Sequence, residues 1–335
     1  REPKPKAAAE VGFERGPRSE IPLLAAARAA LARGEGEEAD RLLAAAIRRN
    51  PRSRFALLLR LERAVQLGRN DETATTMLVL SRLFADVGSA LVSQIAAMAA
   101  DPSTRAAARH VMAGDPQVKR QVLERLARGG ADPGLVLKPA GPGAPTPAAA
   151  EPPAWQRLLL ESMVERGRLA EARSVWARLA GIGQSEPGLY DPDFRGLPGL
   201  PPFTWRFESG GEGFAEPRRA EGGLTVEYAG RARAVLASQL MLLAPGRYDI
   251  AFDAEGRADG EDSRLVWTVE CEPGGRSLVE LPIAGVEFTP KSFRASFTVP
   301  PGCPSQWLWL TGRLAVFPKG QTVTIDGLRI ARAGS

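Results

Sequence analysis

The sequence has little of the chemistry that metal centres and disulfide scaffolds need. Its 335 residues include one His and two Cys, too few for a zinc finger, a His-based metal cage, an iron–sulfur protein or a disulfide-knotted mini-protein. No stretch reaches the roughly 18 uncharged apolar residues that a membrane-spanning helix needs. With 44% apolar and 25% charged residues, the composition predicts a soluble globular chain of two or three domains.

Lysine is also scarce, and no basic block is present. Only six of the 44 basic residues are Lys. Residues 1–150 carry a net charge of +7, residues 151–189 carry 0 and residues 190–335 carry −2. Arginines spread among acids are typical of a solvated helix surface, so we expect no nucleic-acid partner.

The first 18 residues are rich in Pro, Lys and Glu and predict a flexible tail. The chain opens at Arg1 without a Met, and we expect that a leader or anchor can precede it. A tail of this kind can tether the protein to such a segment.

Residues 19–130 and 154–182 predict helices because Ala, Leu, Arg and Glu dominate them. Three glycines are each followed at one spacing by three residues expected to pack inward. The three sets are Gly34 with Ala39, Leu43 and Ala46; Gly68 with Thr73, Met77 and Leu80; and Gly167 with Ala172, Trp176 and Leu179. Between the second and third sets, shorter helices are expected near 88–100, 102–113 and 115–128, the last two started by Asp101-Pro102 and Asp115-Pro116.

The repeated spacing resembles the second helix of a tetratricopeptide (TPR) unit. This resemblance implies TPR-like helical repeats over 19–130 and a TPR-like helix pair over 154–182, with a protein partner bound in the concave groove. An irregular helical bundle is the alternative. Residues 131–153 contain so many Pro and Gly that we expect a linker or strap without a regular element.

From residue 190 to 333 the pattern changes to short alternating strands. Rows of inward-facing residues start at Phe203, Leu224, Tyr248, Leu265, Phe293 and Val323, and Pro-Gly turns separate them. Such a pattern predicts an antiparallel β-sandwich. The fold class expected for the whole chain is therefore multidomain α plus β, with helical repeats followed by a sandwich.

Three strings in this half, DPDFRGLPGLPPFTW, LMLLAPGRYDIAF and TVTIDGLRI, resemble carbohydrate-binding-module-like jelly rolls. The whole layout resembles bacterial TPR proteins with a C-terminal sandwich that are associated with envelope polysaccharide systems. The resemblance implies contact with a polysaccharide and a periplasmic or cell-envelope location, with the cytoplasm as the alternative.

The candidate sugar platform lies in SQWLWLTGRL. If Leu308 and Leu310 face the core, Trp307 and Trp309 project together from the opposite face. Indole rings stack on the apolar face of a pyranose, and Gln306 and Arg313 are then the candidate hydrogen-bonding groups. In the alternative, the helical half or the second sheet covers this face and buries both rings.

Related jelly rolls often hold a structural calcium ion, and the resemblance implies Asp191, Asp193 and Asp326 as its oxygen ligands. In the alternative, each Asp bonds backbone amides in a turn. No other cofactor is expected.

Cys271 and Cys303 are candidates for a disulfide, which fits an oxidising compartment such as a periplasm. Two free buried thiols are the alternative.

No nucleophile elbow, zinc-protease motif, P-loop or dinucleotide fingerprint occurs in the sequence, so we expect no enzyme. The sequence predicts a non-catalytic binding and scaffold protein, in which the helical repeats dock a protein partner and the sandwich contacts a glycan. The alternatives are a purely protein-binding structural component and a glycan-acting hydrolase.

Overall fold

The computed structural model describes residues 19–84, 88–141, 152–183, 188–258, 265–314 and 319–333. The chain divides into two compact units, residues 1–141 and residues 142–335, and each is described by itself. The tail expected over residues 1–18 and part of the expected linker, residues 142–151, lie outside the described residues.

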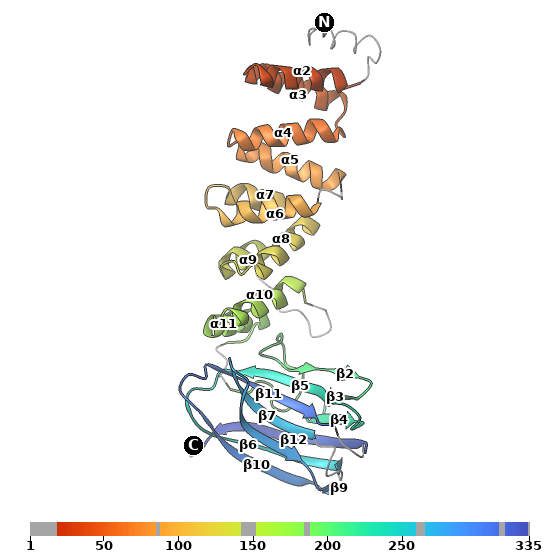
Figure 1. Ribbon diagram of the computed structural model, residues 1–335, viewed down its shortest axis with the longest axis vertical. Coiled ribbons are helices and arrows are strands. Elements are labelled where there is room, and N and C mark those ends of the chain that lie inside the picture. Colours follow the sequence, from red (N-terminus) through yellow and green to blue (C-terminus); the bar gives the residue numbers. More distant parts are fainter. Residues whose placement is uncertain are drawn as a thin grey trace. The chain divides into compact units, whose positions relative to one another are not determined.

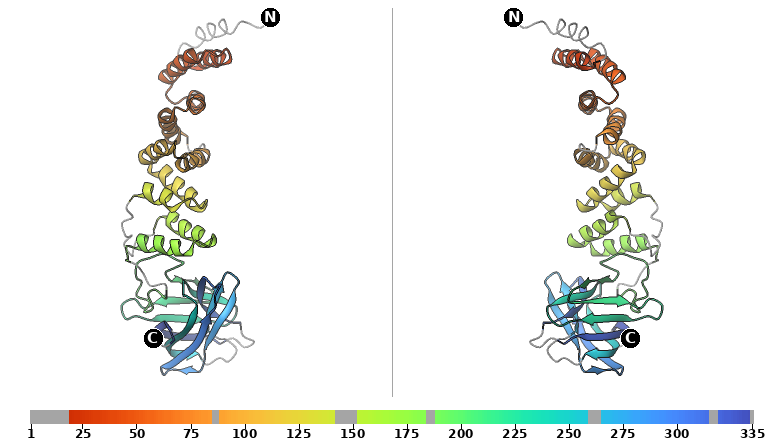
Figure 2. Two further views of the ribbon diagram at one scale, coloured as in Figure 1. Left: turned by 90° about the vertical axis from the view of Figure 1, so that its left-hand side faces the viewer. Right: turned by 90° about the vertical axis from the view of Figure 1, so that its right-hand side faces the viewer.

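Unit 1 is helical, and its helices follow one another from α2 to α9, except that α7 lies beside α5, ahead of α6 (Figures 1 and 2). Their bounds are α2 (Ile21–Ala32), α3 (Gly36–Arg49), α4 (Arg54–Gln66), α5 (Asn70–Leu83), α6 (Gly88–Ala100), α7 (Arg105–Gly114), α8 (Pro116–Arg128) and α9 (Pro133–Ala140). No helix in the described part of the chain is long and apolar enough to cross a membrane.

Glycines close the helix hairpins in the same way at each predicted position. Gly34, Gly68 and Gly167 have φ values of +79°, +65° and +72°, a region that glycine enters at little cost. In each case the amide of the following residue donates to a carbonyl five residues earlier, as Glu35 does to Ala30 at 2.9 Å. All nine residues predicted to pack inward from these glycines are buried. Gly130 closes a further turn in this way, with Ala131 donating to Leu126.

One of the two expected Asp-Pro helix starts is confirmed. Asp115 is the N-cap of α8, and its carboxylate accepts hydrogen bonds from the amides of Gln117 and Val118. The expectation for Asp101 is wrong, because α7 begins only at Arg105. The Asp101 carboxylate instead accepts from the amide and the hydroxyl of Ser103, each at 2.8 Å, which holds a turn before the helix.

The expectation that residues 131–153 lack any regular element is also wrong, because α9 occupies Pro133–Ala140. Asp132 caps this helix, its carboxylate accepting from Gly134 at 2.7 Å. Pro133 stands in the first turn, where its missing N–H is not needed, and Pro139 lies next to the last residue. The prolines therefore mark the two ends of a short helix.

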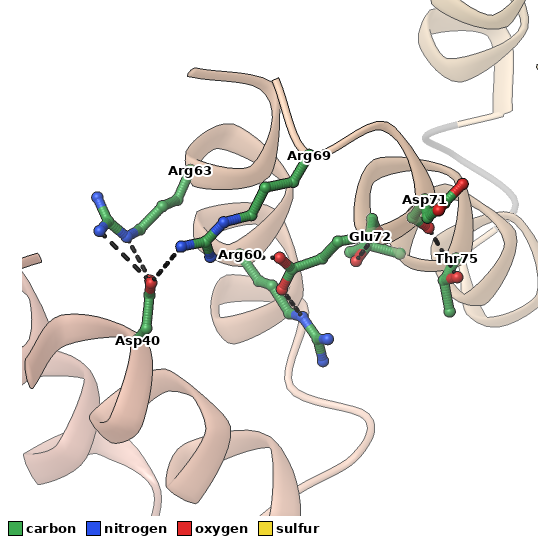
Figure 3. Close-up of polar contacts among 8 residues, drawn as sticks. Asp40, Arg60, Arg63, Arg69, Asp71, Glu72 and Thr75 are labelled. Carbon is green, nitrogen blue, oxygen red and sulfur yellow. Dashed lines mark hydrogen bonds and ion pairs between the residues drawn. The ribbon is translucent and has the colours of Figure 1, made fainter. Parts of the chain in front are cut away.

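An ion-pair network joins α3, α4 and α5 (Figure 3). Asp40 accepts from Arg63 and, at 3.0 Å, from Arg69. Glu72 pairs with Arg60 at 2.8 Å and with Arg69 at 3.4 Å. Arg69 therefore bridges both carboxylates and ties the first helix hairpin to the second.

Acid is expected to weaken this network. Burial would raise the pKa of Asp40, but hydrogen bonds from Arg63 and Arg69 outweigh burial and hold the pKa below its usual value. A carboxyl whose folded pKa is depressed stabilises the fold above its unfolded pKa of about 3.9, and this contribution is lost as pH falls through the folded pKa. Asp40→Asn should therefore lower the stability of unit 1 by roughly 0.5–1 kcal/mol at pH 7 and by progressively less below pH 4.

Melting curves of the full chain between pH 7 and pH 3 check this expectation. Glu37→Gln is the matched control, because Glu37 is exposed on the same helix and makes no ion pair within the described residues. A constant difference between wild type and Asp40→Asn at every pH would contradict the assignment.

The described residues of unit 2 form two helices and an antiparallel β-sandwich. The helices are α10 (Ala154–Glu165) and α11 (Leu169–Ala180). The strands are β1 (Arg206–Phe207), β2 (Ser209–Gly210), β3 (Gly213–Pro217), β4 (Leu224–Tyr228), β5 (Ala234–Met241), β6 (Gly246–Ala258), β7 (Leu265–Glu272), β8 (Arg276–Ile283), β9 (Val286–Glu287), β10 (Lys291–Val299), β11 (Ser305–Gly312) and β12 (Gln321–Arg332). The predicted fold class, multidomain α plus β with a C-terminal jelly-roll sandwich, is confirmed.

Two sheets pack face to face over the apolar core of unit 2 (Figure 1). The five-stranded sheet has the order β1-β5-β11-β7-β8, and the seven-stranded sheet has the order β10-β6-β12-β4-β3-β2, with β9 paired to β6. Trp267, Ile250 and Leu308 are among the fully buried residues between them. The alternating rows predicted this core because successive strand residues face opposite sides.

The structure changes the prediction at both ends of the sandwich. The row starting at Phe203 is mostly a turn, and only Arg206 and Phe207 form a strand. At the other end, the string TVTIDGLRI predicts a strand, an Asp turn and a final strand, but β12 is one continuous strand with an irregularity between Asp326 and Arg329. A β-bulge of this kind absorbs an Asp-Gly pair without ending the strand.

Trp176 on α11 packs against the loop that precedes the sandwich. Its ring is fully buried and meets Tyr190 edge-on at 4.8 Å and Phe203 at 5.9 Å. Its indole N–H donates to the hydroxyl of Thr204 at 3.2 Å. The Arg173 guanidinium lies 4.4 Å from the ring centroid, and burial lowers the pKa of Arg173 to about 10. Arg173 therefore stays charged at neutral pH and gains a cation–π contact.

Candidate functional site

The outer face of the five-stranded sheet presents two tryptophans at its centre. Strand β11 is the middle strand, and Leu308 and Leu310 are fully buried on its inner side. Trp307 and Trp309 lie on the opposite side, and each is only partly buried. Their rings stack with centroids 4.8 Å apart and planes 26° apart. The predicted alternation is confirmed, and together the two indoles form a continuous apolar surface.

Polar groups flank Trp309 on both neighbouring strands, whereas Trp307 has a polar group on β7 and the fully buried Leu240 on β5. Residues directly opposite each other in an antiparallel pair share a face. Glu270 is opposite Trp307 in the register, and Thr268 is opposite Trp309 on β7. Thr268 is in turn opposite Glu280 on β8. On the other side of β11, Ser238 on β5 is opposite Trp309. An apolar surface is thus bordered by carboxylates and hydroxyls.

The indoles are held close to the sheet. Ser238 and Thr268 are 2% and 5% exposed although they stand on the outer face, so neighbouring groups cover this part of the face. The indole nitrogen of Trp309 is buried and has no hydrogen-bond partner among the described residues. A buried donor without a partner carries a free-energy penalty, which an acceptor brought by a ligand would relieve if the ring tilts outward.

The outer face of the seven-stranded sheet is entirely different, because ion pairs and hydrogen bonds cover it. Arg294 pairs with Asp249 at 2.6 Å, Ser296 donates to Asp249 at 2.6 Å, and Ser292 donates to Asp253 at 2.5 Å. Hydrogen bonds from Ser296 and Arg294 hold the pKa of Asp249 below its usual value. This face is typical of a solvated surface, so the sheet with the tryptophans is the candidate binding face.

Gln306 is not available to a ligand, which corrects the prediction that it borders the platform. It is fully buried on the same side of β11 as Leu308. Its amide oxygen accepts from the Leu243 amide at 2.8 Å, and its amide nitrogen donates to the Cys303 carbonyl at 2.9 Å. Gln306 therefore ties the end of β5 to the segment before β11.

Arg313 is exposed just beyond the end of β11, where it pairs with Glu280 at 2.5 Å. Because Glu280 lies on the row that contains Trp309, this ion pair borders the platform. Arg313 remains a candidate for hydrogen bonding to a ligand, while its guanidinium also pairs with the Glu280 carboxylate.

The three predicted calcium ligands do not form a site. The Asp191 carboxylate is buried and accepts from the amides of Arg195, Gly196 and Leu197 at 2.9, 2.8 and 3.2 Å. Asp193 is exposed and lies 3.8 Å from Arg195, and Asp326 is exposed on β12. No group of three potential ligands occurs among the described residues. Asp191 thus organises a loop, as an Asp in a turn commonly does.

Cys271 and Cys303 form a disulfide, with their Cα atoms 5.6 Å apart. Cys271 lies on β7, which carries Glu270, and Cys303 lies in the segment just before β11, which carries Trp307, so the bond joins β7 to the start of β11. It therefore supports one end of the tryptophan platform.

No family model matches the chain, and no curated protein sequence matches it. Among solved structures the chain is similar to a family 4 carbohydrate-binding module, at 14% identity and a TM-score of 0.28 over 38% of this chain and 94% of that one. It is similar to a family 61 module in complex with β-1,4-galactotriose, at 16% identity and a TM-score of 0.29 over 44% and 97% of the two chains. A xylan-binding family 22 module from Paenibacillus barcinonensis matches at 15% identity and a TM-score of 0.28 over 39% and 86%. Likeness at this level says nothing of what this chain binds.

Sequence reasoning missed the polar border of the platform. Glu270 and Thr268 lie in a strand that the sequence predicts. Their positions beside Trp307 and Trp309 depend on the pairing of β7 with β11. These two strands are distant in the sequence, as the separation of 32 between Cys271 and Cys303 shows. No local signal in the sequence specifies that register.

Proposed function

We propose that this chain is a non-catalytic binding protein whose sandwich holds a glycan on the face formed by Trp307 and Trp309. The observation that carries the proposal is the stacked pair of partly exposed indoles at the centre of the sheet face. Sugar rings offer apolar C–H faces to such indoles, and their hydroxyls need polar partners at the border. An exposed aromatic patch on a folded chain also favours a ligand-binding role.

The border favours a neutral glycan. Glu270 stands beside Trp307 and makes no ion pair with another described residue, while the charge of Glu280 is balanced by Arg313. A free carboxylate accepts hydrogen bonds from neighbouring sugar hydroxyls. The same carboxylate repels a uronate, so acidic polysaccharides should bind more weakly than neutral ones, especially at low salt.

Affinity electrophoresis of the full chain through gels containing neutral or uronate-containing bacterial polysaccharides tests the proposal. Wild type should be retarded by at least one neutral polymer, and Trp307→Ala or Trp309→Ala should weaken the interaction about tenfold each, since a stacked ring contributes about 1.4 kcal/mol. Phe288→Ala is the control, because Phe288 is an aromatic that is 74% exposed away from this face. Retardation that survives both Trp substitutions, or that never occurs, would refute the proposal.

A hydrolase would release sugar from the same polymers, and an acid-to-amide change would abolish the release. We propose binding without catalysis, so incubation with a retarding polysaccharide should leave its chain length unchanged. Glu270→Gln should then alter retention of the polymer without altering its length.

We further propose that unit 1 docks a protein partner and that the chain acts beside envelope polysaccharide. Phe55 on α4 and Ile21 on α2 are 73% and 68% exposed, and apolar side chains so exposed favour a partner of apolar character. Phe55→Ser should reduce co-purification of that partner from cells that make the protein, and an unchanged yield would contradict this role. The disulfide supports an oxidising compartment such as the periplasm.

A further inference from the structure

Four helix ends of unit 1 lie together at one edge of the helices, which we call the loop edge. Arg49 at the end of α3 donates to the carbonyl of Ser19, just before α2, at 3.4 Å. Residues 50–53 connect α3 to α4. The Arg54 guanidinium at the start of α4 lies 5.7 Å from the centroid of the Phe84 ring, just after α5. The loop edge is therefore formed by the start of α2, the end of α3, the start of α4 and the end of α5.

The loop edge is rich in arginine. Residues 41–61 contain six Arg and no Asp or Glu. Arg48 and Arg52 are exposed at this edge, and neither makes an ion pair with another described residue. Away from the edge, the arginines of the same helices are paired with carboxylates, as in the network around Asp40 (Figure 3). Glu20, just before α2, contributes one negative charge to the edge, so the excess charge there is positive.

The positions of two of these arginines oppose the helix dipole. Arg52 and Arg54 stand on either side of Ser53, the N-cap of α4. The positive end of a helix dipole disfavours cations, and α3 and α5 carry acidic residues in their first turns instead. The stability of α4 therefore does not explain why Arg52 and Arg54 stand there. An anionic partner at the loop edge does explain it.

Apolar side chains are exposed at the same edge. Phe55 directly follows Arg54 and is 73% exposed, and Ile21 at the start of α2 is 68% exposed. Leu83 near the end of α5 is 36% exposed. Large apolar groups beside unpaired cations fit a partner that brings both carboxylates and apolar side chains.

We propose that the loop edge binds an acidic segment of another protein, with carboxylates paired to Arg48 and Arg52 and an apolar side chain packed on Phe55. The fork of a guanidinium matches the two oxygens of a carboxylate. This inference rests on the proposal that unit 1 docks a protein partner, and it names the chemistry of that partner.

Other anionic macromolecules fit the loop edge less well. Nucleic acids and polysaccharides have no aliphatic side chains to pack on Ile21. An anionic membrane would bring its headgroups against the carboxylate of Glu20, which is adjacent to Ile21, and like charges repel. An acidic protein segment meets neither objection, because its acidic and apolar residues can be placed separately.

Fluorescence anisotropy of the full chain with a labelled peptide tests this surface. In the peptide, Phe-Leu is flanked on both sides by Glu and Asp, and a matched peptide carries the corresponding amides. The acidic peptide should bind roughly tenfold more tightly than the amide peptide. Its binding should weaken as the NaCl concentration rises, because salt screens exposed charges. Equal binding of the two peptides, or no binding of either, would overturn the proposal.

The double substitution Arg48→Gln and Arg52→Gln should weaken the acidic peptide roughly tenfold. Arg125→Gln with Arg128→Gln is the matched control, because it removes the same charge from exposed positions in the last turn of α8. That turn is at the opposite end of α8 from its N-cap Asp115. Equal effects of the two double substitutions would show general attraction between charges and would count against a defined surface.

Vesicles of phosphatidylcholine with phosphatidylglycerol, and a short DNA duplex, are the competing probes. The chain should bind both more weakly than it binds the acidic peptide. Tighter binding of either probe, lost on Arg48→Gln with Arg52→Gln, would assign the loop edge to a membrane or a nucleic acid and reject the acidic protein segment.

Co-purification from cells separates this inference from the docking proposal. Loss of the partner with Phe55→Ser and also with Arg48→Gln and Arg52→Gln supports an acidic partner. Loss with Phe55→Ser alone would leave the docking proposal in place and refute the acidic partner. Retention of the partner in the Phe55→Ser variant would contradict the docking proposal itself. All three substituted residues are exposed, so the fold should tolerate these changes.

Discussion

Trp176→Ala is expected to lower the free energy of unfolding of unit 2 by about 3–5 kcal/mol, the range for truncating a large buried aromatic. The ring is fully buried among Tyr190, Phe203 and Arg173, so its removal leaves a cavity that rigid neighbours fill only partly. The Thr204 hydroxyl loses its donor, and the buried Arg173 guanidinium loses the face over which it lies. Both losses add to the cavity term.

Scanning calorimetry of the full chain measures this loss, because a chain of two compact units need not unfold in one step. Trp176→Phe keeps a ring but not the N–H donor and should cost roughly 1 kcal/mol. Arg178→Ala, an exposed change on the same helix, should cost little. If Trp176→Ala were no worse than Arg178→Ala, the buried contact of α11 with the loop would be refuted.

The double substitution Cys271→Ala and Cys303→Ala is expected to destabilise unit 2 by about 3–4 kcal/mol. The disulfide closes a loop with a sequence separation of 32, and a cross-link of that length restricts the unfolded chain by about this amount in the chain-entropy model. Both sites are buried beside well-packed strands, so alanine leaves small voids that add to the loss.

Denaturant unfolding with and without reductant isolates the cross-link. Reductant should destabilise wild type by nearly the same amount as the double substitution and should leave the double variant unchanged. The single substitutions should match the double one, since either removes the bond. Wild type that is insensitive to reductant while unfolded would show that the thiols are not joined.

The helical part was predictable where the signals are local. A glycine at the hairpin turn needs a positive φ, and the residues at fixed spacing after Gly34, Gly68 and Gly167 lie on one helix face. The short helix α9 was not predicted, because two prolines in eight residues argue against a helix until their positions at its ends are known. A tetratricopeptide assignment stays a prediction.

The candidate site was half predictable. Period-two alternation put Trp307 and Trp309 on one face, but the same alternation puts Gln306 inside with Leu308, and only the contacts with Leu243 and Cys303 explain why a polar residue is accommodated there. The proposed calcium ligands failed for a related reason. Backbone amides donate to the Asp191 carboxylate. Which amides lie close enough to do so depends on the path of the whole loop.

The sequence by itself determined the order of helices before strands, the side of β11 that each residue takes and the cysteines available for pairing, because these follow from local spacing and composition. The tertiary structure alone decided that α10 and α11 belong to one compact unit with the sandwich, that Glu270 lies beside Trp307, and that Arg54 lies beside Phe84. These last arrangements join residues tens of positions apart, and only the packing of complete elements brings such residues together.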